Sequence, residues 1–524
     1  MEDNLAVDAP PRDLRRGRDG GCRLVLTNTR NPLPWLLTTL LLLWPAAYNG
    51  APLIFADTLD FPAMMLEPAV RQFRSRGYAM LAGWPSLMMG SFWPVILAQA
   101  ALTAGLIQAT LRLVLPALGA AGRALAGAAV ALTTAPWAAS YVMPDALTAP
   151  GALALVLLVS GRAGWRLAVP AGAVVVMSCA SHVTHALVLG SALAGVLALR
   201  LVPLRRTAIG LVCIGLGYGS VLVANRVHTG HAEYVRGGEV FLAARFAGDG
   251  LLQRYLAQEC PDARLPMLCA AREVLPRNAD DFLWLGDSPL RPAGDLYAAS
   301  AEFRIANRAV MAELWPEWLA AALPRAATQL LMVQAGDGLE QALMEAVVER
   351  IAATLGEPAA AHHAASRQAC VEMADDLLAW AMAPAGLMGL VLAPLMLLRV
   401  RDPVLRLLLA IACLACVANA LAVGFGGSEH ARYTARIVWL LPFGAMVALL
   451  HPRFGAVTEG TRLRPDGRIS PSESGLGATD ARFPRVFARC ATKTSCFPTF
   501  SDARHSQRRP RRGNHPGRPS GDHP

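Results

Sequence analysis

The chain has 524 residues, of which 54% are hydrophobic and only 16% charged, and its mean hydropathy is +0.38. Average soluble domains carry roughly a quarter charged residues, so this composition excludes a disordered chain and disfavours a water-soluble enzyme. The formal net charge is +10, but residues 452–524 contain 14 Arg and Lys against 6 Asp and Glu, whereas residues 227–378 contain 12 Arg against 21 Asp and Glu. Because the charges are segregated along the chain, the positive net charge does not indicate a nucleic-acid partner, and none is predicted.

Long apolar runs reach the ~18 to 20 residues that a helix needs to cross a bilayer, and they predict an all-α, polytopic transmembrane bundle. Each run is bounded by an Arg cluster or a Pro/Gly turn. Ten spans are expected, at residues 33–48, 91–114, 124–142, 146–161, 167–181, 184–200, 207–225, 380–399, 405–425 and 435–451.

The positions of the arginines predict the orientation of these spans, because positively charged short loops stay on the cytoplasmic side. Clusters precede the first span and lie in alternate connections: Arg15, Arg16, Arg18, Arg112, Arg123, Arg162, Arg166, Arg200, Arg205, Arg206, Arg399, Arg401 and Arg406. Both termini are therefore predicted to be cytoplasmic. The first span is either an uncleaved signal anchor, which the thirty or so preceding residues favour, or the apolar region of a signal peptide.

The predicted organisation follows from these spans. It consists of a cytoplasmic segment 1–31, a transmembrane core 32–226 with an outer acidic loop 49–90, an extracytoplasmic domain 227–378, transmembrane helices 379–451 and a basic, disordered cytoplasmic tail 452–524. Helical periodicity at Phe241–Gln258, Glu302–Ala322 and Asp337–Leu355 predicts that the extracytoplasmic domain is mostly helical. The tail has too few apolar residues to form a core.

Ten cysteines are present, and Cys260 and Cys269 flank a proline-containing loop in the predicted outer domain. An oxidising compartment would allow these two to form a disulfide that fixes the turn. Cys413 and Cys416 form a C-x-x-C inside an apolar helix and are expected to be packing residues. The histidine pairs of the chain have no carboxylate or Cys partners at zinc-site spacing, so no metal ligands are assigned.

Two carboxylates, Asp57 and Asp60, follow the first span in an otherwise apolar setting. On a helical turn they would share one face. A carboxylate in a partly dry site near the membrane surface has a raised proton affinity and is suited to act as a general base toward a hydroxyl. Alternatively, either residue caps a helix.

Two further connections on the predicted outer side carry polar groups. Asp145 follows Pro144 between the third and fourth spans, where it either starts a helix or lines a site. His182 and His185 lie between the fifth and sixth spans. Ionisable groups at membrane depth usually line a cavity rather than face lipid, so both histidines are candidate substrate-binding residues.

The last outer loop leads directly into the tenth span and carries His430, Arg432, Tyr433 and Arg436 as candidate substrate-binding residues. Arg432 and Arg436 are four residues apart and share one side of a helix. Arginines are normally depleted on the outer side, so these two indicate an anionic partner such as a phosphate. The alternative is pairing with Glu429 or the acidic outer domain.

In layout the chain resembles the GT-C superfamily of integral-membrane glycosyltransferases, which includes protein O-mannosyltransferases and lipid A aminoarabinose transferases. The resemblance covers about residues 1–230 and depends on a cytoplasmic N-terminus, a first helix followed by an acidic outer loop, and a seven-helix core with a large insertion after it. Ala56-Asp57-Thr58-Leu59-Asp60 stands where the acidic motif of the family would be. Several members have an adjacent acidic pair instead, which leaves open whether Asp57 or Asp60 is the base.

The resemblance implies a sugar donor on a polyprenyl phosphate and an envelope glycan, lipid or protein acceptor, at the outer face of a bacterial inner (plasma) membrane whose lipids surround the protein. It implies catalysis by Asp57 or Asp60 in a single displacement, with arginines such as Arg432 and Arg436 stabilising the leaving phosphate. No nucleotide-binding loop is needed and no cofactor is assigned, although a divalent metal ion stays open. Two other classes compete: an O-antigen ligase or polymerase-like enzyme that depends on outer arginines and histidines, and a non-enzymatic transporter or envelope scaffold.

Overall fold

The structure is a computed structural model, and it describes residues 31–67, 74–284, 300–339, 344–370, 373 and 380–452. Within these ranges the secondary structure is helical, with one isolated parallel bridge between Leu53 and Tyr141. The prediction of an all-α fold is thus confirmed for the described part of the chain. The N-terminal segment before residue 31 and the basic tail beyond residue 452 lie outside it.

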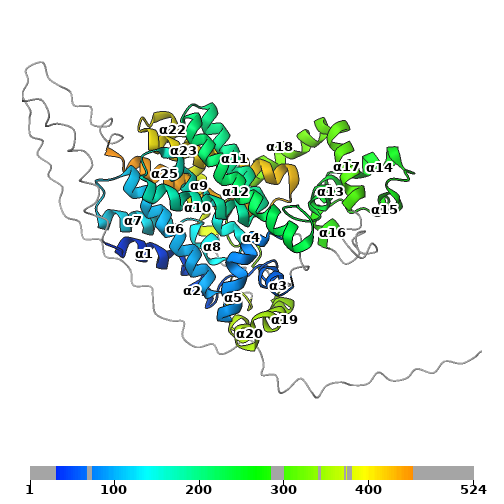
Figure 1. Ribbon diagram of the computed structural model, residues 1–524, viewed down its shortest axis with the longest axis horizontal. Coiled ribbons are helices and arrows are strands. Elements are labelled where there is room, and N and C mark those ends of the chain that lie inside the picture. Colours follow the sequence, from blue (N-terminus) through cyan, green and yellow to red (C-terminus); the bar gives the residue numbers. More distant parts are fainter. Residues whose placement is uncertain are drawn as a thin grey trace, which may run out of the picture. The chain divides into compact units, whose positions relative to one another are not determined.

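The first half of the chain forms a bundle of helices (Figure 1). Its helices are α1 (Leu33–Leu42), α2 (Trp44–Asn49), α3 (Asp60–Leu66), α4 (Arg76–Tyr78), η1 (Ala79–Gly83), α5 (Trp84–Met89), α6 (Trp93–Val114), α7 (Ala120–Val130), α8 (Ala135–Ser140), η2 (Pro144–Leu147), α9 (Thr148–Ser160), α10 (Trp165–Ser181), α11 (Val183–Ala198) and α12 (Leu204–Thr229).

The second half adds the remaining helices of the described chain. They are α13 (Gly238–Gly248), α14 (Leu251–Glu259), α15 (Pro266–Ala271), α16 (Ala279–Trp284), α17 (Ser300–Glu313), α18 (Trp315–Leu331), α19 (Met344–Leu355), α20 (Glu357–Ala364), α22 (Ala383–Arg399), α23 (Pro403–Gly426), α24 (Ala431–Val438) and α25 (Leu440–Leu449).

Three described helices are long and apolar enough to cross a membrane, namely α6, α12 and α23. They correspond to the spans expected at 91–114, 207–225 and 405–425. Their ends follow from local chemistry: the side chain of Asp402 accepts the N–H groups of Val404 and Leu405 at the start of α23, and Gly230 ends α12 with a left-handed φ of 78°. By their length and composition, these three helices indicate that the chain is associated with a membrane.

Two of the other expected spans are interrupted. The run 33–48 breaks at Leu43 between α1 and α2, and the run 124–142 breaks between α7 and α8. In each case a proline, Pro45 or Pro136, stands in the first turn of the second helix. Proline has no N–H to donate to the preceding turn, so the earlier helix ends before it. Hydropathy alone did not predict these breaks.

The segment 227–378 separates into two parts. Helices α13 to α17 surround a core of their own that includes Phe246, Phe282 and Phe303. Helix α18 then leads from this group back to α23 (Figure 1) and packs along it. The two helices approach closely at Gly424, where an added Cβ would lie 2.7 Å from the carbonyl oxygen of Ala322.

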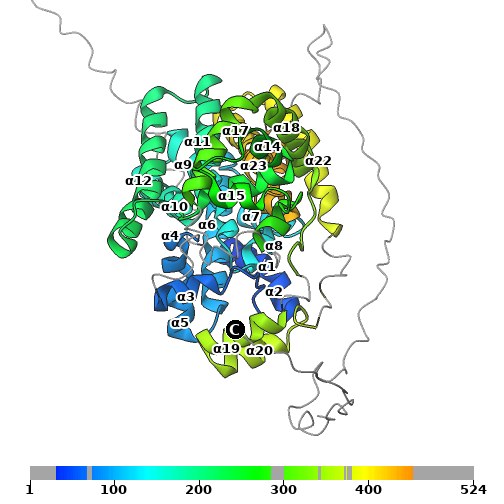
Figure 2. The same cartoon turned by 90° about the vertical axis from the view of Figure 1, so that its right-hand side faces the viewer.

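Helices α19 and α20 form the other part and lie beside α3 and α5 in each view of the structure (Figures 1 and 2). Val347, Ile351 and Ala360 belong to the same hydrophobic core as the bundle. The periodicity at Asp337–Leu355 predicted a helix from Asp337, but α19 begins at Met344 and Asp337 lies in a turn. Similarly, Gly250 divides the helix expected at Phe241–Gln258 into α13 and α14.

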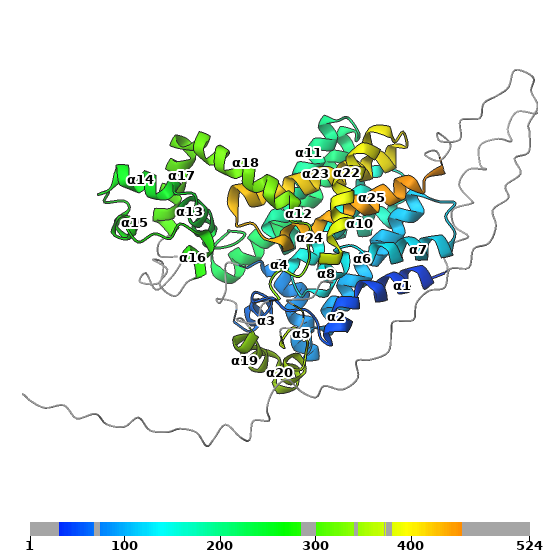
Figure 3. The same cartoon turned by 180° about the vertical axis from the view of Figure 1, so that it is seen from behind.

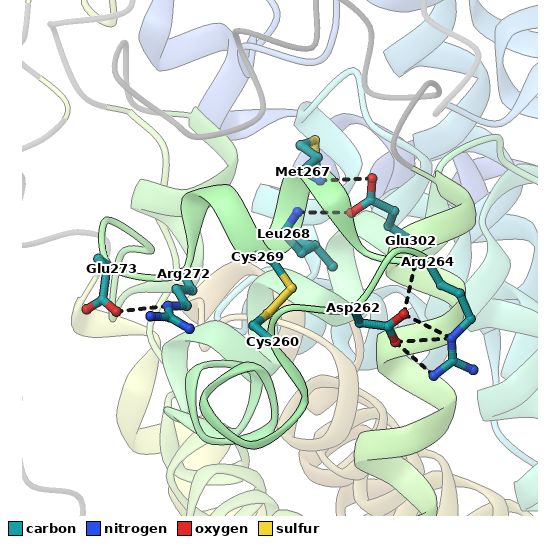
Figure 4. Close-up of a disulfide and its surroundings, with 9 residues drawn as sticks. All are labelled: Cys260, Asp262, Arg264, Met267, Leu268, Cys269, Arg272, Glu273 and Glu302. Atoms are coloured by element: carbon teal, nitrogen blue, oxygen red, sulfur yellow. Dashed lines mark hydrogen bonds and ion pairs between the residues drawn. A yellow bond between two sulfur atoms is a disulfide. The ribbon is translucent and has the colours of Figure 1, made fainter.

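A disulfide joins Cys260 and Cys269, the pair expected from the sequence, with their Cα atoms 5.6 Å apart (Figure 4). It connects the end of α14 to α15. The carboxylate of Glu302 accepts the backbone N–H groups of Met267 and Leu268 at the start of α15, at 3.2 and 2.9 Å. The bond and this cap fix the short α15 against α17.

Candidate functional site

The loop after α2 is fixed by main-chain contacts on both sides. Leu53 exchanges backbone hydrogen bonds with the segment at Tyr141, and the side-chain amide of Gln368 donates to the carbonyl of Ile54 and accepts its N–H, at 2.6 and 3.0 Å. The Thr58 hydroxyl accepts the N–H of Phe55 at 3.0 Å. These contacts hold the turn that carries the first carboxylate.

Asp57 and Asp60 converge on one arginine. Asp57 lies in the turn, and Asp60 is the first residue of α3, so they do not share a helical face as the spacing predicted. Arg74 joins them, since its Nη2 contacts Asp57 and its Nε donates to Asp60 Oδ2 at 3.2 Å. Arg350 of α19 donates to the other oxygen of Asp60 at 2.8 Å. Asp60 is therefore engaged by two guanidinium groups.

The surroundings of Asp57 alter its affinity for a proton. Removal from water raises the pKa of Asp57, while the positive charges of Arg74 and Arg432 oppose this effect. A carboxylate with a raised pKa binds a proton more readily than an ordinary aspartate. Asp57 is thus suited to accept a proton from a substrate, whereas Asp60 is held by Arg74 and Arg350.

Arg432 is a buried cation with unused donors. Its guanidinium lies over the ring of Phe55, 3.9 Å from the ring centroid, and its Nη2 donates to the Tyr433 hydroxyl at 2.9 Å. Its Nε and Nη1 are buried and have no hydrogen-bond partner. Burial opposes its charge, but Tyr433, Asp145 and Asp57 raise the pKa of Arg432, so it stays protonated.

Arg436, one turn further along α24, is fully engaged. Its Nη1 donates to Asp145 Oδ1 at 2.7 Å, and its Nε and Nη2 donate to Asn419 Oδ1 at 3.1 and 2.7 Å. It is 1% exposed. Burial opposes ionisation of Asp145, but the nearby Arg436, His182, Arg432 and His185 together outweigh it, so the pKa of Asp145 is held at about 2. The two arginines lie on one side of α24 as expected, but only Arg432 has free donors.

The two histidines have structural contacts. His182 caps α11 by accepting the N–H of Thr184 at 3.2 Å, and burial lowers its pKa to about 4, with Arg436 acting in the same direction. His185 is fully buried and contacts the Thr148 hydroxyl at 2.7 Å. Neither side chain lines the cavity described below.

His430 and Tyr433 flank the arginines. The His430 ring nitrogens are each 3.6 Å from a carboxylate, Nε2 from Asp280 and Nδ1 from Asp337. Tyr433 lies between the two guanidiniums, which are 4.8 and 5.1 Å from its ring centroid. Glu429, the partner that the sequence offered for the arginines, instead contacts Arg245 at 3.6 Å.

A cavity lies where the loop after α2, η2, α24 and residues 335–337 meet, and its empty space of about 420 Å³ includes open solvent. Helix α24 borders it and packs against α8, α9, η2 and α18; Figure 3 shows α24 beside α8. The cavity combines an apolar, aromatic wall with four charged side chains. The aromatic residues are Phe55, Trp137 and Tyr141, and the charged ones are Asp145, Asp337, Arg432 and Arg436.

Several residues of this region were not predicted as site residues. Arg74 and Arg350 bind the carboxylates from distant positions in the sequence, and Trp137 and Asp337 line the cavity. Of these four residues only Asp337 has a local signal in the sequence, because glycines flank it on both sides and such a pattern is typical of a turn. In the structure Gly336 and Gly338 both adopt a positive φ. Within the described ranges no group of three or more His, Cys, Asp or Glu could hold a metal ion.

Three comparisons with known proteins identified no relative of this chain. A scan of protein-family models, a search of curated proteins and a search of solved structures each found no match. The function is therefore inferred from the chemistry of the site.

Proposed function

We propose that the chain is an integral-membrane glycosyltransferase that moves a sugar from a polyprenyl-phosphate donor to a lipid, glycan or protein hydroxyl. In this proposal the ten predicted spans cross a bacterial inner membrane and the cavity opens on its outer face. The proposal depends mainly on Arg432, which lines the cavity and whose buried guanidinium has two nitrogens without a hydrogen-bond partner. A donor phosphate would supply the acceptors that these nitrogens lack.

The contacts of the charged side chains support a different role for each of them. Arg432 binds the donor phosphate, and the aromatic wall of Phe55, Trp137 and Tyr141 accommodates the sugar and the first part of the lipid. The ion pair of Asp145 and Arg436 holds α24 in place. Asp60 keeps Arg74 beside Asp57, which leaves Asp57 as the base.

The reaction is a single displacement. Asp57 takes the proton of the acceptor hydroxyl as its oxygen bonds to the anomeric carbon of the sugar. The bond from that carbon to the phosphate oxygen breaks, and the phosphate leaves with the electron pair, stabilised by Arg432. The configuration of the sugar carbon is inverted. No metal ion is required for this sequence.

The test uses a deletion strain that expresses the unaltered chain, Asp57→Asn or Asp262→Asn at equal membrane abundance. Asp262 is an exposed-loop partner of Arg264 and serves as the matched control for loss of a carboxylate. Asp57→Asn is expected to lose a surface sugar and to accumulate its lipid-linked donor, because Asn has no basic oxygen. Asp262→Asn should behave as the unaltered chain. Full restoration by Asp57→Asn would contradict the carboxylate mechanism.

A ligase or polymerase-like envelope enzyme is the second candidate, and His430 between Asp280 and Asp337 is the observation that favours it. Histidine is the side chain that most often acts as a general base. Loss of activity in His430→Gln, with Asp57→Asn fully active, would select this candidate. A transporter or scaffold would show neither loss of the sugar nor accumulation of a donor.

A further inference from the structure

A second arginine site lies at the other end of α6 from the cavity. Gln99, near the start of α6, donates to the carbonyl of Tyr141, a cavity residue, at 2.9 Å. Arg112 follows thirteen residues later, which corresponds to about 20 Å along a helix. Arg112 is joined there by Arg123 of α7. Neither arginine takes part in the proposed transfer reaction.

The two guanidiniums have donors without acceptors. Arg123 is 2% exposed, and its Nη1 donates to the carbonyl of Leu118 at 2.5 Å. Its Nε and Nη2, which form one edge of the guanidinium, are buried without a hydrogen-bond partner, and so is Nε of Arg112. The two positive charges repel each other. Arg112 is half-buried and brings the pair to the surface.

No carboxylate of the surrounding helices compensates this charge. The sequence has no Asp or Glu between residues 31 and 56 or between 74 and 144, the ranges that contain α1, α6 and α7. Gln108 fixes these three helices together, since its Nε2 donates to the Thr38 hydroxyl and to the carbonyl of Arg123, at 3.1 and 3.3 Å. A buried, fixed cation without a partner is costly, so the pair requires an anion from outside these helices.

We propose that Arg112 and Arg123 form a binding site for a phosphate group, supplied by the headgroup of an anionic phospholipid in the leaflet opposite the cavity. The free edge of Arg123 matches two oxygens of a phosphate, and Arg112 adds a second cation. Both residues flank the short connection between two predicted spans, which the positive-inside rule assigns to the cytoplasmic side. Anionic lipids attract basic residues at that surface. The proposal does not depend on the transferase reaction.

The test measures lipid retention by native mass spectrometry of the purified full chain, titrated with phosphatidylglycerol or phosphatidylcholine. The variants are Arg112→Gln, Arg112→Gln/Arg123→Gln and the control Arg205→Gln, an exposed arginine of another predicted cytoplasmic connection. The unaltered chain and Arg205→Gln should prefer phosphatidylglycerol. Each substitution at the site should weaken this preference about fivefold. If the double variant does not fold, Arg112→Gln decides the test.

A parallel titration with inorganic phosphate, read as melting temperature, distinguishes the two sources of the phosphate. Stabilisation of the unaltered chain by phosphate, lost in Arg112→Gln and without lipid preference, would support the phosphate site but assign it to a soluble ligand. Equal lipid retention and equal phosphate response in all four proteins would overturn the proposal. Binding to neither ligand would do the same.

Discussion

Arg432 and Arg436 are a matched pair that separates donor binding from folding. They lie one turn apart on α24, but Arg432 has two unpartnered nitrogens whereas Arg436 is hydrogen-bonded to Asp145 and Asn419. We predict opposite effects for the two Gln substitutions. Arg432→Gln should weaken donor binding with little effect on stability, and Arg436→Gln should unfold the protein more easily.

The magnitudes follow from these contacts. A hydrogen bond to a charged group contributes about 1.5–3 kcal/mol, so loss of one charge-assisted bond of Arg432 should raise the Kd for a polyprenyl phosphate roughly 10- to 150-fold. The stability of Arg432→Gln should change by about 1 kcal/mol or less, because lost contacts with Phe55 and Tyr433 are offset by removal of a buried cation. Arg436→Gln leaves Asp145 buried without its partner and should cost about 3–5 kcal/mol.

The assay compares the two variants with the unaltered chain in detergent, using a sugar-free polyprenyl phosphate as ligand. Kd is measured by ligand titration, and stability is measured by melting temperature without ligand. An unchanged Kd for Arg432→Gln would refute the assignment of its free donors to a phosphate. A loss of stability as large as that of Arg436→Gln would show that Arg432 is a structural residue.

Three further predictions concern other parts of the chain. Because burial raises the folded-state pKa of Asp57, transfer should decline as pH falls through that raised pKa, and a pH–rate profile with no decline on the acid side would contradict its role as the base. The pKa of His182 is about 4 when folded and 6.5 when unfolded, a difference of about 2.5 units, so stability should decrease by up to about 3 kcal/mol as pH falls from 6.5 to 4. His182→Asn keeps a capping side chain and should lose less stability over that range, as measured by melting temperature at each pH; equal losses would contradict the assignment. Reduction of the Cys260–Cys269 bond, which closes a short loop, should destabilise the α13–α17 group by about 2–3 kcal/mol. Proteolysis of that group with and without reductant measures the change. Equal rates of cleavage would contradict the prediction.

Local patterns in the sequence predicted the parts of the fold that depend on local chemistry. The uninterrupted apolar runs of α6, α12 and α23 identified these helices, because length and hydropathy are properties of a single segment. Hydropathy does not predict the breaks before Pro45 and Pro136, because it measures only how apolar a segment is. It takes no account of the backbone N–H that a proline lacks.

The candidate site depends on contacts between distant segments. Asp57, Asp145, Arg432 and Arg436 were identified from polar residues in short predicted connections. The structure places the last three on one cavity, whereas Asp57 does not line it and interacts electrostatically with Arg432. The contact of Arg350 with Asp60 joins residues 290 positions apart, and nothing local distinguishes Arg350 from other surface arginines. For the same reason the sequence could not tell the engaged Arg436 from the unengaged Arg432.

The most direct test of the central claim is an experimental structure of the full chain in a lipid nanodisc with a polyprenyl phosphate. We predict phosphate density in the cavity within hydrogen-bond distance of Arg432, with Asp57 facing the side from which an acceptor would approach. A phosphate bound elsewhere, with the Arg432 nitrogens still unpartnered, would contradict this prediction.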